Sequence, residues 1–74
     1  MKDNVDLIKN IGLSEKAAKV YLACLEMGEG TIQDLARQAK IKRTTIYYLL
    51  TELIENGALV ETRRNKKSFY VATH

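Results

Sequence analysis

Two helical patterns separated by only three residues constrain most strongly how this chain can fold. Thr31 begins the first, residues 31–39, and Asp34 lies three positions on, in the arrangement of a capping box. The segment 40–42 interrupts the pattern. The second pattern then occupies residues 43–56, with apolar positions at helical spacing and Gly57 just beyond its end. A short helix, a tight turn and a longer helix form a helix-turn-helix.

Two more helical patterns precede this pair. Residues 3–11 carry apolar side chains at helical spacing, and residues 14–27 begin at Ser14, a good N-cap. Gly28 and Gly30 are expected to close the second of these helices. Its predicted buried positions are Ala18, Tyr21, Leu22 and Leu25.

The end of the chain has the pattern of a β-hairpin. Residues 59–63 and 68–72 are rich in β-branched and aromatic side chains, and the polar segment 64–67 between them includes Asn65, which tolerates positive φ. A lone two-stranded hairpin is marginal in water, so it must pack on the helices. In this register Tyr70 and Ala72 face inward, whereas Phe69 and Val71 face outward.

Length and pattern together predict one domain over residues 1–74, mainly α with a small β-hairpin. The expected architecture is a winged helix-turn-helix: four helices, then a two-stranded wing over residues 59–72. A domain of 74 residues has a thin core, so we expect a second copy to stabilise it as a homodimer. Candidate dimer surfaces are the first helix (Val5, Leu7, Ile8) and the outward-facing Phe69 and Val71.

Charge is distributed unevenly along the chain. Residues 1–41 are balanced, so the whole net charge of +3 comes from residues 42–74. A basic surface at one end of a small domain suits a polyanion, although an ordinary solvated surface explains the charge equally well.

The start of the helix at 43–56 is the first candidate binding surface. Only Ile46 is needed there for the core, and the remaining side chains can all donate hydrogen bonds to phosphates or base edges. Glu52 and Glu55 make the far end acidic, so that end should point away from a polyanion. The candidate residues are Lys42, Arg43, Thr44, Thr45, Tyr47 and Tyr48. Two alternatives remain open: a threonine could cap the helix, and a tyrosine could cover the core.

The second candidate surface is the hairpin tip. Four cations gather there, and on a winged helix the tip lies beside the second helix of the motif, over the phosphate backbone. They are Arg63, Arg64, Lys66 and Lys67. The alternative is an ordinary solubilising turn.

Two stretches resemble a known family: GLSEKAAKVYLACLEMG at residues 12–28 and TIQDLARQAKIKRTTIYYLLTELIENGALV at residues 31–60. They are similar to the DNA-binding domain of TrmB-type transcriptional regulators, which are winged-helix proteins. The resemblance covers about residues 7–72 and implies that the threonines and tyrosines at 44–48, with Arg43, lie on a DNA face. Lys40 departs from the family by replacing a usual glycine, and Tyr48 replaces a common basic residue.

Full-length members of that family carry an effector-binding region after the wing, and no residue here matches it. A stand-alone regulator and an excised domain both remain open, and we expect no small-molecule site in this chain. The expected partner is double-stranded DNA. The main alternative is a winged helix that contacts proteins, which predicts an apolar recognition face.

Nothing in the sequence favours an enzyme. The one histidine, His74, is the last residue, and no set of Asp, Glu, His and Cys has metal-ligand spacing. We therefore expect no catalytic residue, metal or cofactor. Cys24 has apolar neighbours, and we interpret it as a small buried residue. No segment is apolar enough to span a membrane, so the expected location is the cytoplasm.

Overall fold

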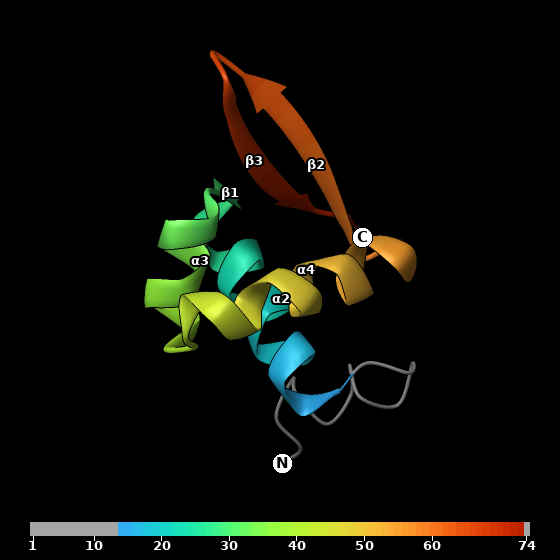
Figure 1. Ribbon diagram of the computed structural model, residues 1–74. Coiled ribbons are helices and arrows are strands. Elements are labelled where there is room, and N and C mark those ends of the chain that lie inside the picture. Colours follow the sequence, from blue (N-terminus) through green and yellow to red (C-terminus); the bar gives the residue numbers. More distant parts are fainter. Residues whose placement is uncertain (1–13, 74) are drawn as a thin grey trace.

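The computed structural model describes residues 14–73, which form three helices and three strands (Figure 1). The elements are α2 (Glu15–Met27), β1 (Glu29–Gly30), α3 (Ile32–Ala39), α4 (Arg43–Glu55), β2 (Leu59–Arg64) and β3 (Lys67–Ala72). The helix expected at residues 3–11 lies outside the described residues. The predicted mainly helical fold with a β-hairpin is therefore confirmed, while the count of four helices is not.

Side-chain caps define where α2 and α3 begin. The Ser14 hydroxyl accepts the Ala17 N–H at 3.1 Å. Thr31 and Asp34 form the predicted capping box: the Thr31 hydroxyl accepts the Asp34 N–H at 3.2 Å, and the Asp34 carboxylate accepts the Thr31 N–H at 3.3 Å. Each bond satisfies an N–H that a helix start leaves without a partner. Both caps are as the sequence predicts.

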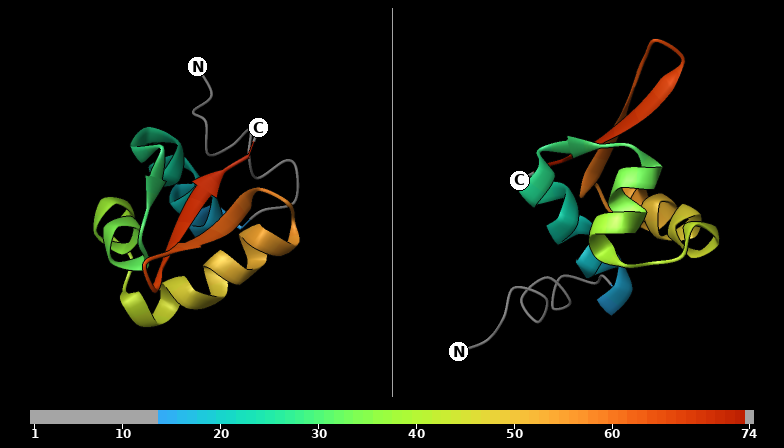
Figure 2. Two further views of the ribbon diagram at one scale, coloured as in Figure 1. Left: turned by 90° about the horizontal axis from the view of Figure 1, so that it is seen from above. Right: turned by 90° about the vertical axis from the view of Figure 1, so that its left-hand side faces the viewer.

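The predicted two-stranded wing is present as β2 and β3, and β1 adds a third strand that was not predicted. Glu29 pairs with Val71 and Gly30 with Tyr70, which gives the antiparallel order β1-β3-β2 (Figure 2). Gly28, at φ 83°, ends α2 as predicted, but the chain then extends into β1. Gly30 therefore belongs to a strand and not to the helix end. Two residues are too few to show a strand's alternating pattern, which is why the sequence did not reveal β1.

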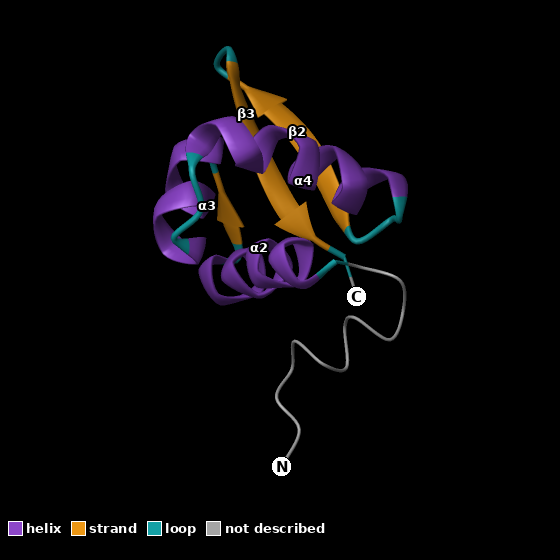
Figure 3. Cartoon of the chain, turned by 60° about the horizontal axis from the view of Figure 1, so that its bottom comes forward, coloured by secondary structure: helices purple, strands orange, loops and turns teal. Residues whose placement is uncertain are grey.

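The hydrophobic core lies between the three helices and one face of the sheet (Figure 3). Its largest fully buried side chains are Val20, Cys24, Leu35, Ile46, Leu49, Leu53 and Leu59. On α2 the core stripe runs through Ala17, Val20, Tyr21 and Cys24. Leu25 is 40% exposed, so its predicted burial is wrong. Ala18, which is fully buried, and Tyr21, which packs against the core, are confirmed. The buried side of α2 is wider than predicted, because positions one residue earlier are buried too.

The wing turns through two residues instead of the predicted four. Arg64 pairs with Lys67, and both Asn65 (φ 52°) and Lys66 (φ 67°) are left-handed, as in a type I′ hairpin. Positive φ at Asn65 was expected. The same conformation at Lys66 was not, because lysine has no special preference for it.

Alternation along β3 follows the predicted register. Tyr70 and Ala72 are buried against the helices, whereas Phe69 and Val71 lie on the other face and are half-buried. Each wing strand extends one residue further toward the tip than the sequence indicated, because the turn is shorter.

Lys40 ends α3 in the left-handed conformation, at φ 59° and ψ 45°. This is the turn position where a glycine was noted as usual in the family. Its backbone N–H donates to Arg37 O at 3.3 Å, and the next N–H, of Ile41, donates to Ala36 O at 3.0 Å. A side chain with a Cβ is strained there, so the turn between α3 and α4 carries a local cost.

We expect Lys40→Gly to raise the free energy of unfolding by roughly 0.5–1 kcal/mol, because glycine removes the strain at positive φ. Lys40→Ala is the control, since it removes the same charge but keeps the Cβ. Urea unfolding of the two variants and the wild type measures the difference. Equal stability of the glycine and alanine variants would contradict the argument.

Candidate nucleic-acid interface

The first half of α4 presents its polar side chains to solvent. Its N-cap, Lys42, makes no side-chain capping bond, and neither Thr44 nor Thr45 is the cap, because both lie inside the helix. Tyr47 is 50% exposed and Tyr48 60% exposed, so neither covers the core. The alternatives of a threonine cap and a core-covering tyrosine are thereby removed.

The buried side of α4 determines where each exposed residue points. Ile46, Leu49, Leu50 and Leu53 are the buried positions of this helix. At about 100° per residue, Arg43 and Thr45 fall on opposite flanks of the exposed side. Thr44 and Tyr48 lie between the two flanks.

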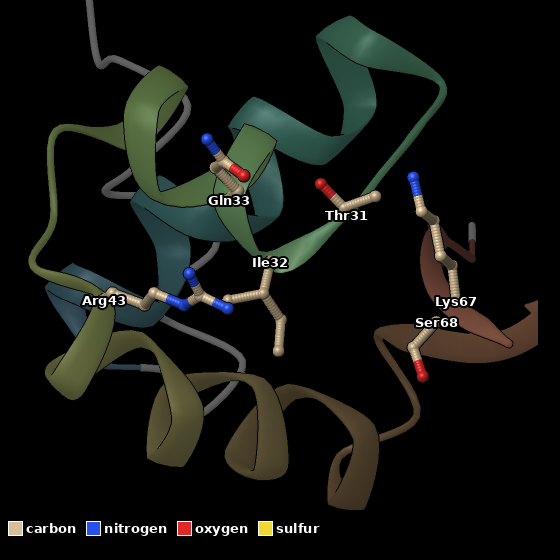
Figure 4. A pocket seen from close by; sticks show the side chains of 6 residues that line it. All are labelled: Thr31, Ile32, Gln33, Arg43, Lys67 and Ser68. Carbon is tan, nitrogen blue, oxygen red and sulfur yellow. The ribbon is translucent and has the colours of Figure 1, made fainter.

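On one flank, Arg43 and the wing lie on opposite sides of an open hollow. Arg43 lines this hollow of about 230 Å³ together with Lys67 and Ser68 of β3 and the start of α3 (Figure 4). Thr31, Ile32 and Gln33 complete the lining. The structure thus brings together two of the predicted residues, Arg43 and Lys67, from separate elements. Gln33 and Ser68 were not predicted, because their nearness to Arg43 depends on how the wing packs.

On the other flank, Lys42 and Thr45 line a larger groove of about 590 Å³ with three lysines that the sequence analysis did not select. We call it the lysine groove, and its lining residues are Lys16, Lys19, Ala39, Lys40, Ile41, Lys42 and Thr45. Lys16 and Lys19 are exposed on α2, three residues apart and therefore on one side of that helix. The spacing of these two lysines could have predicted a basic side of the helix from sequence. The charge count did not reveal it, because residues 1–41 are neutral as a whole.

The four wing cations do not form one cluster. The register places Arg63 opposite Ser68 on the face that carries Tyr70, and Arg64 opposite Lys67 on the other face. Arg64 forms an ion pair with Glu29 of β1, and its guanidinium lies 4.4 Å from the centre of the Phe69 ring. Lys66 is at the turn. Arg64 therefore links β2 to β1 through Glu29 on the outer face of the sheet. Phe69, for which the sequence indicated no role, contacts its guanidinium by a cation–π interaction.

The acidic end of α4 is anchored elsewhere. Glu52 accepts hydrogen bonds from the backbone N–H of Ser14, at 3.1 Å, and from its hydroxyl, at 3.4 Å. This carboxylate is thus held at the start of α2. The helix therefore runs from a cationic, donor-rich beginning to an acidic end that is bound to its own domain.

Two ionisable side chains are buried in the core: Tyr70 of β3 and Cys24 of α2. Burial is the main cause that raises the pKa of Tyr70, and the neighbouring Glu61 and Tyr47 raise it further. Burial also raises the pKa of the Cys24 thiol, and Cys24 Sγ donates to Tyr70 O at 3.2 Å. Cys24 is fully buried, in agreement with its interpretation as a small core residue.

Comparison with known proteins places the chain in a family. A family model described as "Sugar-specific transcriptional regulator TrmB" matches residues 7–74. The chain belongs to the TrmB family. This is a family of transcriptional regulators. The chain is also 30% identical over 70 residues to the uncharacterized protein YrhO of Bacillus subtilis (strain 168), and the match covers 93% of this chain but 26% of YrhO. This chain therefore spans about a quarter of the length of YrhO.

Solved structures support the winged-helix fold. The TM-score is 0.79 to Bordetella bronchiseptica BpsR, whose DNA binding is regulated by 6-hydroxynicotinic acid, at 16% identity over 93% of this chain and 54% of that one. The TM-score is also 0.79 to NadR in complex with 4-hydroxyphenylacetate, at 24% identity, and the match covers 92% of this chain and 50% of NadR. For the ST1889 protein of Sulfolobus tokodaii the TM-score is 0.74 at 25% identity, and the match covers 96% of this chain and 77% of that protein. At these identities the first two show the fold alone.

Within residues 14–73, no helix is both long and apolar enough to cross a membrane. The same residues hold no group of three or more His, Cys, Asp or Glu side chains arranged to bind a metal ion.

The raised pKa of Tyr70 predicts a loss of stability in alkali. A phenol whose pKa is higher in the folded than in the unfolded chain stabilises the fold fully below the unfolded value, about 10, and this contribution is lost as pH rises through the folded value. We expect the wild type to lose more stability than Tyr70→Phe between pH 9 and pH 11. Urea unfolding at each pH measures this, with Tyr48→Phe, an exposed tyrosine, as the control. Parallel curves for wild type and Tyr70→Phe would disprove the assignment.

Proposed function

We propose that this chain binds double-stranded DNA sequence-specifically as the DNA-binding domain of a transcriptional regulator. In this proposal α4 enters the major groove by its first turns, and the wing lies on the phosphate backbone. The observation that carries the proposal is the polarity of α4. Its exposed beginning offers hydrogen-bond donors beside a basic hollow, while Glu52 near its end is bound to Ser14.

Each predicted residue has a role that its chemistry permits. Arg43 can pair bidentately with guanine, and the methyl groups of Thr44 and Thr45 suit a thymine methyl. Tyr47 and Tyr48 present hydroxyls at the ends of exposed rings, which can donate to phosphates or base edges. The backbone N–H groups at the start of α4 lack side-chain caps and favour a phosphate.

The wing supplies affinity without sequence information. Arg63, Lys66 and Lys67 are exposed and their cations are available to phosphates. Arg64 contributes less in this proposal, because Glu29 already opposes its charge.

Two copies of the domain would place two α4 helices in successive major grooves about 34 Å apart, so we propose a homodimer. Of the predicted dimer surfaces, the first helix lies outside the described residues. Phe69 supports Arg64, which leaves Val71 and the 48% exposed Val60 beside it as the apolar candidates on the sheet. A protein of this kind acts on chromosomal DNA, and we place it in the cytoplasm.

The basic wing predicts a measurable salt dependence. We expect the wild type to bind a random duplex with an affinity that falls steeply with salt, and Lys66→Ala/Lys67→Ala to lower the slope of log K against log [salt] by about two. Arg64→Ala is the matched control, and its slope should fall by less than that of Arg63→Ala. Fluorescence anisotropy across a salt series measures all four proteins. Absence of salt-dependent binding by the wild type would exclude DNA and turn attention to a protein partner for the same face.

Arg43 should affect specificity in addition to affinity. We expect selection from a random duplex library to enrich one motif with the wild type, and Arg43→Ala to relax a single position of it at a cost of about 1–3 kcal/mol. Lys67→Ala, on the other side of the same hollow, is the control and should weaken all sequences equally. An unchanged motif with Arg43→Ala would remove the base-reading role.

A further inference from the structure

The lysine groove is lined by four lysines and by no acidic residue. Thr45 adds a hydroxyl to the lining, and Ala39 and Ile41 make the rest of it apolar. Within residues 14–73 none of these lysines forms an ion pair; the one pair found there joins Arg64 to Glu29. Four like charges around one groove repel each other, and an anion placed among them is attracted by all of them.

Position identifies which anion the groove fits. In Figure 1 the wing rises on one side of α4, and the start of α2 lies on the other side. The lysine groove joins that start of α2 to the turn before α4 and to Thr45 on the helix itself. The major groove of B-DNA is about 12 Å wide and has a phosphate backbone along each edge. A helix inserted between the two backbones has phosphates on both flanks.

We propose that the lysine groove is a second phosphate site, which binds the DNA backbone on the flank of α4 opposite the wing. This inference rests on the proposed function and adds to it the residues Lys16, Lys19 and Lys40. The recognition helix is then held from both sides, with Lys67 of the wing on the backbone of one strand and the lysine groove on the backbone of the other, while Arg43 reads a base between them.

The backbone at Lys40 fits this proposal independently. The residue sits at φ 59°, where glycine is unstrained, yet it carries a long cationic side chain that lines the groove. The strain is offset if that ammonium binds a phosphate. The turn thereby contributes two of the four lysines, and α2 contributes the other two.

The test is the salt dependence of binding to one short duplex by the full chain. We expect Lys16→Gln/Lys19→Gln to lower the slope of log K against log [salt] by about two relative to wild type. Lys16→Arg/Lys19→Arg keeps both charges and should restore the slope. Leu25→Glu/Asn56→Asp changes the net charge by the same amount at two exposed positions that line neither the hollow nor the lysine groove, and it should leave the slope near that of wild type. Thermal unfolding confirms that each variant is folded.

The outcomes separate this inference from the proposed function. If the wild type binds and the glutamine variant keeps its slope, the lysine groove takes no phosphate and only this inference is overturned. If the wild type does not bind, both fail together. The groove could bind a free small anion instead of the DNA backbone, and a titration with inorganic phosphate alone tests this. Saturable shifts of the amide resonances of residues 16–19 and 40–45, together with an unchanged salt slope for DNA in the glutamine variant, would overturn the assignment to the backbone.

Discussion

The whole interface depends on the burial of one side of α4. Ile46, Leu49, Leu50 and Leu53 fill the space between α2, α3 and the sheet, and this burial fixes the rotation of the helix about its axis. A rotation by one residue would bury Tyr47 and expose a leucine. Because the apolar stripe allows one orientation, it also determines that Arg43 faces the wing and Thr45 faces α2. Packing energy and the placement of the binding residues are therefore consequences of the same side chains.

The sequence could predict what depends on neighbours along the chain. The caps at Ser14 and Thr31, the positive φ of Asn65 and the buried stripe of α4 are local patterns, and these predictions are confirmed. β1 could not be predicted, because two residues carry no periodicity and are held by β3, about 40 positions later. The buried side of α2 was predicted only in part: Ala18 and Tyr21 are confirmed, whereas Leu25 is exposed. Both sides of this helix carry apolar residues, so an exposed leucine there resembles a core leucine.

Charge was the property hardest to locate from sequence. Counting by halves made residues 1–41 neutral, yet Lys16 and Lys19 come from that half and lie beside Lys40 and Lys42 in space. Conversely Arg64, counted with the wing cations, is opposed by Glu29 from the neutral half. Side chains of opposite sign that cancel in a count are separated by folding onto different surfaces. The basic surface of this domain is for that reason broader than its modest net charge suggests, and it flanks α4 on both sides.

β3 is the central strand of the sheet, and this has a mechanical consequence. It is hydrogen-bonded on one edge to β1 and on the other to β2, and it carries Lys67 at its start. Just past its end, Thr73 donates its N–H to Ala58 O and accepts the Tyr21 hydroxyl through its carbonyl, each at 2.8 Å. β1 pairs only with Tyr70 and Val71, so both edges of β3 are held beside Thr73. The other end, which carries Lys67, is paired with β2 alone and can bend more freely, which lets the outermost cations of the wing follow the surface that they contact.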